Sequence, residues 1–139
     1  MSEPVSAALR MAVAQRARGC CEYCLVPDNR VFFPHEPDHI VAGQHGGSTV
    51  LENLALACMQ CNRAKGANIA SVDPATGEPV FLFHPRRDGW TEHFRLDGAR
   101  VAGLTAAGRA TARLLKFDDP ERIELRSTLQ RAGHYPVAP

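Results

Sequence analysis

The chain has 139 residues and a formal net charge of +1. This length allows one hydrophobic core with at most a small appendage, and no apolar run approaches the roughly 20 residues that a membrane-spanning helix needs. We therefore expect a protein that does not cross a membrane, and the near-neutral charge gives no independent sign of nucleic-acid binding. Fourteen of the sixteen basic residues are arginine, the side chain that fits phosphate oxygens best, although most arginines lie on solvated faces beside acids.

The first half of the chain predicts a helix, two strands and a second, short helix. Residues 5–18 lack glycine and proline and predict a helix that stops at Gly19. Residues 30–33 suggest a short strand that Pro34 and Pro37 interrupt, and residues 38–41 resume the extended chain before a loop at 43–48. Residues 54–57 then predict the partner strand, and residues 61–65 a short helix that ends near Gly66.

The second half predicts strands followed by helices. Residues 73–79 form a turn, residues 80–83 a buried strand and residues 90–96 a further strand. Thr105 can cap a helix that runs to residue 117, and Asp119 with Pro120 opens a last helix that ends near Gly133. We expect an α+β fold with a core at 1–70 and an extension at 71–139 that packs on this core and is not clearly a separate domain.

Two Cys-x-x-Cys pairs, here called knuckles, are the strongest chemical pattern in the chain: Cys21/Cys24 and Cys58/Cys61. A gap of two residues lets both sulfurs of a pair face one ion, and four thiolates satisfy tetrahedral zinc. The alternatives are two redox dithiols or two disulfides. The chain begins Met1-Ser2-Glu3-Pro4 with no apolar signal segment, which favours a reducing cytoplasm and therefore zinc. Cys20 would leave three residues between itself and Cys24, and we assign it no ligand role.

Several further motifs lie in order between and after the knuckles: Asp38-His39-Ile40, Gly46-Gly47-Ser48, the run from Leu51 to Ala57, and Asn62-Arg63-Ala64-Lys65-Gly66. Together with the cysteines, this segment, from about residue 19 to 68, resembles the HNH endonucleases of the ββα-metal class. The resemblance implies a ββα-metal core that a four-cysteine zinc site holds together. The tail after residue 80 is similar to that of a bacterial subgroup of these proteins, to which we assign no activity.

The resemblance also implies a reaction and a set of site residues. Hydrolysis of a phosphodiester needs a base that deprotonates water and a cation that stabilises charge on the phosphate. The resemblance gives the base to His39 and the divalent ion, Mg²⁺ or Mn²⁺, to Asp38 and Asn62, whose oxygens are hard ligands. Asn62 stands where the final histidine of the family name falls, which predicts weak metal affinity in the absence of DNA. Products would carry 5′-phosphate and 3′-hydroxyl ends.

Three other positions have a functional and a purely structural interpretation. Asn53 matches the middle asparagine of the family, whose amide bonds across the loop to hold the strand of the base, whereas a lone asparagine would be read as a turn or capping residue. Lys65 approaches the phosphate from the short helix or is a solvated helix-end lysine. The loop with His45 contacts DNA or is simply flexible.

The remaining histidines and arginines carry no separate prediction. We treat His35, His84, His93 and His134 as structural or surface residues. Five arginines can contact phosphates but more often lie on solvated faces: Arg63, Arg86, Arg87, Arg95 and Arg109.

The leading hypothesis is a cytoplasmic, metal-dependent DNA endonuclease with structural zinc. A catalytically inactive, zinc-stabilised nucleic-acid-binding module is the first alternative. A thiol redox protein is the second.

Overall fold

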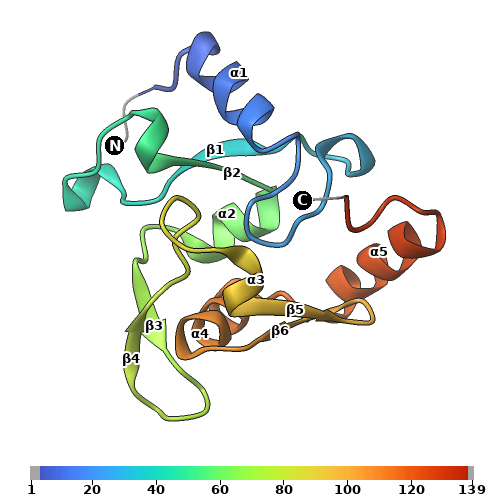
Figure 1. The fold of residues 1–139 in the computed structure, drawn as a ribbon. Helices are drawn as coiled ribbons and strands as arrows, with labels where there is room; N and C mark the ends of the chain where they lie inside the picture. The colour runs from blue at the N-terminus through green and yellow to red at the C-terminus, as the bar shows by residue number, and fades with distance from the viewer. Residues whose placement is uncertain (1–3, 138–139) are drawn as a thin grey trace.

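The computed structural model describes residues 4–137. The expected core at 1–70 and extension at 71–139 therefore each have one end, residues 1–3 and 138–139, outside the described residues. Within the described residues, three two-stranded antiparallel sheets are combined with five α-helices, which confirms the α+β class. Figure 1 shows α1 above the first hairpin and the second and third hairpins below it. None of the helices in residues 4–137 has the length and apolar character needed to span a bilayer.

The first hairpin has its second strand where predicted, at 54–57, but its first strand begins two residues earlier than the predicted 38–41 and includes Pro37. A proline is tolerated there because each strand of a two-stranded sheet is an edge strand. Strand β1 (Glu36–His39) pairs with β2 (Leu54–Ala57) in a register that places His39 opposite Leu54 and Asp38 opposite Ala55. All four residues of β2 are buried, because α1 covers one face and the main core lies on the other. The hairpin is therefore held between two apolar layers.

Helix α1 (Ala7–Arg16) begins at Ser6, whose side chain accepts a hydrogen bond from the amide of Leu9. It ends before Arg18 and Gly19, which both have positive φ, as expected from the glycine at this position. The helix packs Val13 against Leu54 and Leu56 of β2. It leads directly into the first knuckle.

Two predictions in the first half are corrected by the structure. Residues 30–33 form no strand: Asp28–Arg30 is a 3₁₀ turn, and Phe32 is 91% exposed. The sequence Pro27-Asp28-Asn29 favours a turn over a strand here. The Asp28 carboxylate accepts a hydrogen bond from the amide of His35 and so fixes the bend. The short helix α2 (Met59–Lys65) begins two residues earlier than predicted, because Cys58 itself acts as its N-cap.

The second half differs more from the prediction. The turn at 73–79 is present and joins β3 (Ala70–Val72) to β4 (Pro79–Phe81), but this strand is not buried, since Phe81 is 70% exposed. Residues 90–96 are not one strand. They begin as the one-turn helix α3 (Trp90–His93) and continue as β5 (Phe94–Asp97), because the Trp90 indole turns inward to donate to the carbonyl of Tyr23.

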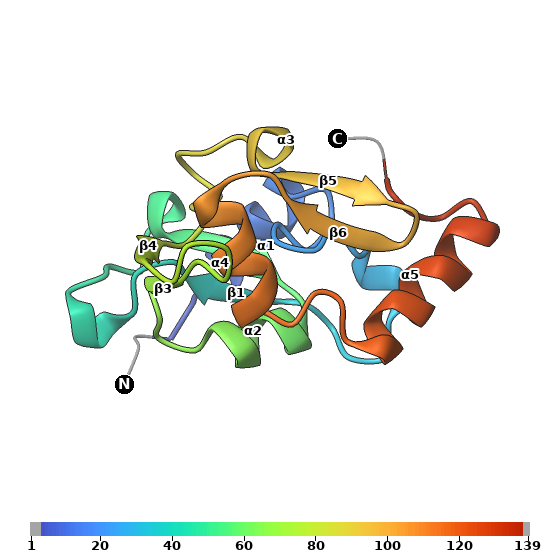
Figure 2. The same ribbon diagram turned by 90° about the horizontal axis from the view of Figure 1, so that it is seen from below.

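The last strand and the last two helices pack back toward the first half of the chain. Strand β6 (Arg100–Gly103) pairs with β5 and leads to α4 (Ala106–Leu114), which Thr105 caps as predicted. Helix α5 (Pro120–Arg131) follows, with Pro120 in its first turn. Figure 2 shows α4 against the second hairpin and α5 beside the turn of the third hairpin.

A single large cluster of buried side chains joins the two halves. It contains the four knuckle cysteines together with aromatic residues from the second half: Phe83, Phe94, Phe117 and Tyr135. The Tyr135 hydroxyl donates to the carbonyl of Cys24 over 2.7 Å. The tail therefore closes on the first knuckle.

Candidate functional site

The four knuckle cysteines converge on one point. Their sulfurs all lie within 4.8 Å of one another, and Cys24 Sγ and Cys58 Sγ are 3.7 Å apart. A tetrahedral ion with zinc–sulfur bonds of about 2.3 Å places its ligand sulfurs about 3.8 Å apart. All four residues are buried, and the described cysteines form no disulfide. The arrangement fits a structural metal ion such as zinc and not the disulfide alternative.

Local hydrogen bonds shape each knuckle. The amide of Cys24 donates to Cys21 Sγ over 3.5 Å, and the amide of Cys61 donates to Cys58 Sγ over 3.4 Å. These bonds turn each pair of sulfurs to one side. Cys20 lies outside the cluster, as the spacing predicts, and its thiol contacts the carbonyl of Arg18 instead.

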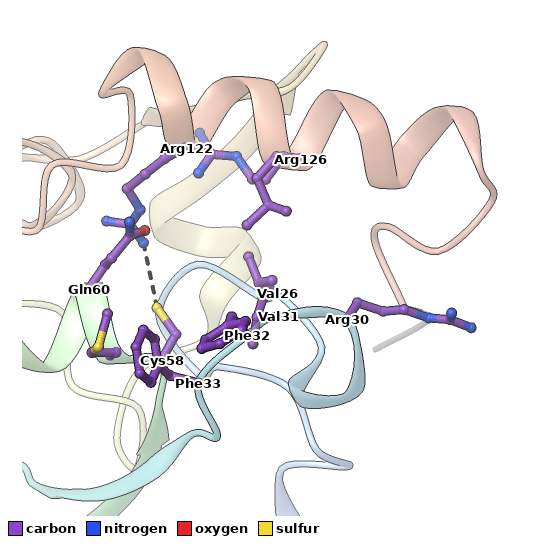
Figure 3. A pocket seen from close by; sticks show the side chains of 11 residues that line it. Val26, Arg30, Val31, Phe32, Phe33, Cys58, Gln60, Arg122 and Arg126 are labelled. Carbon is purple, nitrogen blue, oxygen red and sulfur yellow. Dashed lines mark hydrogen bonds between the residues drawn. The ribbon is translucent and has the colours of Figure 1, made fainter.

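An arginine from α5 covers the cluster, and no sequence pattern indicates its role. Arg122 Nη2 lies 3.0 Å from Cys61 Sγ and 3.7 Å from Cys58 Sγ, and Figure 3 shows the side chain descending from α5 toward Cys58. Its other terminal nitrogen donates to the carbonyl of Leu115, and the guanidinium lies over the Phe117 ring. Burial lowers the pKa of Arg122, but the charges of the thiolates outweigh it and raise this pKa above its usual value. Arg122 thus neutralises part of the negative charge of the thiolates.

The loop between β1 and β2 is tied by the side chain of Asn53. Its Oδ1 accepts from the amide of Val41, and its Nδ2 donates to the carbonyls of Val41 and Ser48, all at 2.8–2.9 Å. These three hydrogen bonds use most of the donor and acceptor capacity of one side-chain amide. The residue at the end of the strand, His39, is thereby held against a closed loop.

Gly47 is the residue that lets this loop close. A Cβ added there would lie 1.7 Å from the carbonyl oxygen of Val41 and 2.8 Å from Asn53 Nδ2. Any side chain at position 47 would displace the loop from the side-chain amide of Asn53. The Gly46-Gly47-Ser48 motif is therefore needed for close packing within the loop.

His39 is oriented by the same loop. Its Nε2 lies 2.9 Å from Thr49 Oγ1, and the ring is partly exposed. When Nε2–H donates to this hydroxyl, the ring lone pair lies on Nδ1. Thr49 is a contact that sequence reasoning missed.

Asp38 points to the opposite side of β1, into the core. Its Oδ2 accepts a hydrogen bond from the Tyr23 hydroxyl at 3.1 Å and lies 3.2 Å from Lys65 Nζ. Burial raises the pKa of the Asp38 carboxyl above its usual value, and Lys65 opposes this rise. Burial, with the neighbouring charge of Asp38, raises the pKa of Tyr23 as well. Tyr23 lies between two cysteines, so the metal cluster and this carboxylate are directly linked.

Lys65 and Asn62 both lie on α2, which packs against β1. Lys65 is buried, and besides Asp38 its Nζ contacts the carbonyl of His39 at 3.2 Å. Asn62 is half-buried and lies in the middle of α2. The carboxylate of Asp38 and the side-chain amide oxygen of Asn62 are hard donors, of the kind that Mg²⁺ or Mn²⁺ prefers. His45 lies exposed in the loop, in the 3₁₀ turn Gly43–His45.

Residues 21–68 match the model of the HNH endonuclease family. The match covers both knuckles, the hairpin and α2, which confirms the resemblance of this segment to a nuclease-type family. It leaves α1 and everything after Asn68 outside. Neither the curated proteins nor the solved structures contain a significant match to the chain.

Proposed function

We propose that the protein is a metal-dependent DNA endonuclease that hydrolyses phosphodiester bonds. The observation that carries this proposal is His39, a partly exposed imidazole at the end of a strand that Asn53 and Thr49 hold in place, inside the segment that matches the HNH endonucleases. A fixed, accessible imidazole is what a general base requires.

In the proposed reaction, His39 Nδ1 accepts a proton from water while Nε2–H donates to Thr49. The resulting hydroxide forms a new bond to phosphorus, and the bond from phosphorus to the 3′ oxygen breaks. The 3′ oxygen then takes a proton from solvent water and His39 returns its own proton to solvent, which leaves a 3′-hydroxyl and a 5′-phosphate. Asn53 acts as a positioning residue, because its bonds to Val41 keep the end of β1 in place.

Asp38 and Asn62 are proposed to hold the divalent ion, Mg²⁺ or Mn²⁺. When bound, such an ion stabilises negative charge on the phosphate and on the departing oxygen. Burial raises the pKa of the Asp38 carboxyl, and the ammonium of Lys65 acts against this rise and favours the charged carboxylate. Zinc in the cysteine cluster has a separate, structural role. The described cysteines form no disulfide bond, which suits a protein of the reducing cytoplasm.

One observation favours the second candidate, a zinc-stabilised nucleic-acid-binding module without cleavage. Asp38 already has a cationic partner in Lys65, so a divalent ion must bind next to an ammonium group. A module of this kind would bind DNA and leave it intact.

Cleavage of supercoiled plasmid distinguishes the two functions. Wild-type and His39→Ala proteins are compared with Mg²⁺, Mn²⁺ or chelator, after zinc content is measured in both. We expect relaxed or linear product only from wild type with metal. Intact plasmid with a folded, zinc-loaded wild type favours the binding module, and undiminished cutting by His39→Ala removes His39 as the base.

A further inference from the structure

A groove runs along the side of the hairpin where Lys65 meets Asp38. One side is lined by Ile40 and Val41, which directly follow β1, and Lys65 lines the groove as well. The other wall comes from residues 81–88, beyond the segment that matches the family. The groove has a volume of about 310 Å³. It adjoins the candidate site, because Lys65, which lines the groove, contacts both Asp38 and the carbonyl of His39.

Lys65 cannot supply the cation that a substrate phosphate needs, because its side chain is buried and paired with Asp38. The far wall carries two other basic side chains, His84 and Arg87. Arg87 is exposed, and its guanidinium forms no hydrogen bond or ion pair with any residue in the range 4–137. The acid on this wall, Asp88, is engaged, since its Oδ2 accepts the amide proton of His84 at 2.9 Å.

His84 is set up as a hydrogen-bond donor. Its Nδ1 accepts the amide proton of Arg86 at 3.1 Å, so the neutral ring carries its proton on Nε2. Burial, followed by the charge of Arg87, lowers the pKa of His84, which keeps the ring neutral at pH 7. Lys65 contributes to the same shift, as expected for groups that share one groove.

We propose that His84 and Arg87 bind backbone phosphates of the DNA next to the phosphate that is cut, so that the second half of the chain supplies one wall of the substrate groove. This rests on the proposed endonuclease function. A guanidinium and a neutral N–H donor match phosphate oxygens, and such contacts position a duplex without reading its sequence. Phe81 and Ile69, which are exposed at the rim, offer apolar contact to the sugars.

The test measures binding of a fluorescein-labelled duplex by anisotropy between 50 and 200 mM KCl, with zinc-loaded protein carrying His39→Ala to prevent turnover. Adding Arg87→Ala should weaken binding roughly fivefold and reduce the slope of log Kd against log salt by about 0.9, the value for one phosphate contact. His84→Ala should weaken binding roughly threefold, and Arg87→Lys should keep the slope. Arg95→Ala, an exposed arginine on β5, is the matched control and should change neither quantity.

The outcomes separate this inference from the function on which it rests. If wild type cuts plasmid but Arg87→Ala changes neither affinity nor slope relative to Arg95→Ala, the groove assignment is wrong and the endonuclease stands. If Arg87→Ala weakens binding but wild type cuts nothing, the groove binds DNA and the catalytic proposal fails. Absence of any DNA binding overturns both.

Discussion

At the scale of single residues, the hairpin depends on short, specific contacts. Asn53, Gly47 and Thr49 are separated by a few positions, and each acts on the backbone or ring of another residue in the same loop. His39 is fixed by one hydroxyl, whereas the backbone beneath it is fixed by the three bonds of Asn53. The orientation of the ring and the shape of the loop are therefore separable by mutation.

Thr49→Val should lower kcat by about fivefold with little change in KM, because one hydrogen bond contributes about 1 kcal/mol and the isosteric valine leaves the loop packing intact. Steady-state cleavage of a labelled duplex gives both constants. Thr49→Ser keeps the hydroxyl and should restore most of kcat. A valine variant with undiminished kcat and an impaired serine variant would show that the methyl group, and not the bond to His39, is what matters.

At the scale of elements, α5 is held to the nuclease segment by charge as well as by packing. Arg122 joins Cys58 and Cys61 to the backbone carbonyl at the end of α4, while Leu129 packs into the main core. Residues that form hydrogen bonds to metal ligands strongly affect the affinity for the metal. Metal binding and the position of α5 should therefore depend on each other.

Arg122→Met should release zinc to a chromophoric chelator about tenfold faster, because it removes the buried cation and keeps most of the side-chain volume. Arg122→Lys should be intermediate, since lysine keeps the charge and loses the fork of donors. Arg131→Met changes an exposed arginine at the end of the same helix and should behave as wild type. If Arg122→Met releases zinc at the wild-type rate, Arg122 contributes packing alone and does not stabilise the bound metal.

The elements that the sequence predicts are those whose signal is local. Strand 54–57, the turn at 73–79, the N-cap Thr105 and Pro120 in the first turn of α5 are all predicted correctly, because each depends on neighbours in the chain. The region 90–96 fails because the Trp90 indole turns toward Tyr23, a residue far away in sequence. The same distinction holds for the site: cysteine spacing reveals the metal cluster, whereas Thr49 and Arg122 become visible only once distant segments meet.

At the scale of the whole molecule, one cluster of buried side chains contains both the knuckles and the apolar residues of the second half. Phe83, Phe117 and Tyr135 pack in the same cluster as the cysteines, and Tyr135 donates to Cys24. A chain of this size buries too little apolar surface to lose such a centre without consequence. Loss of the metal should therefore unfold both halves together.

Cys58→Ser should abolish binding of one zinc per chain and remove the cooperative thermal transition, because metal binding and folding are coupled. Zinc is measured by atomic emission and unfolding by circular dichroism. Cys20→Ser, next to the first knuckle but outside the cluster, should keep both zinc and melting temperature. A zinc-loaded Cys58→Ser protein with a normal transition would contradict the four-cysteine assignment.

The position of Arg122 in the chain has a consequence for synthesis. Cys61 precedes Arg122 by 61 residues, which the ribosome adds in about 3–12 s at roughly 5–20 residues per second. All four thiolates have left the ribosome before the cation that covers them is made. The nascent chain can thus take up its ion first, and the thiols remain open to oxidants until α5 is complete and closes over them.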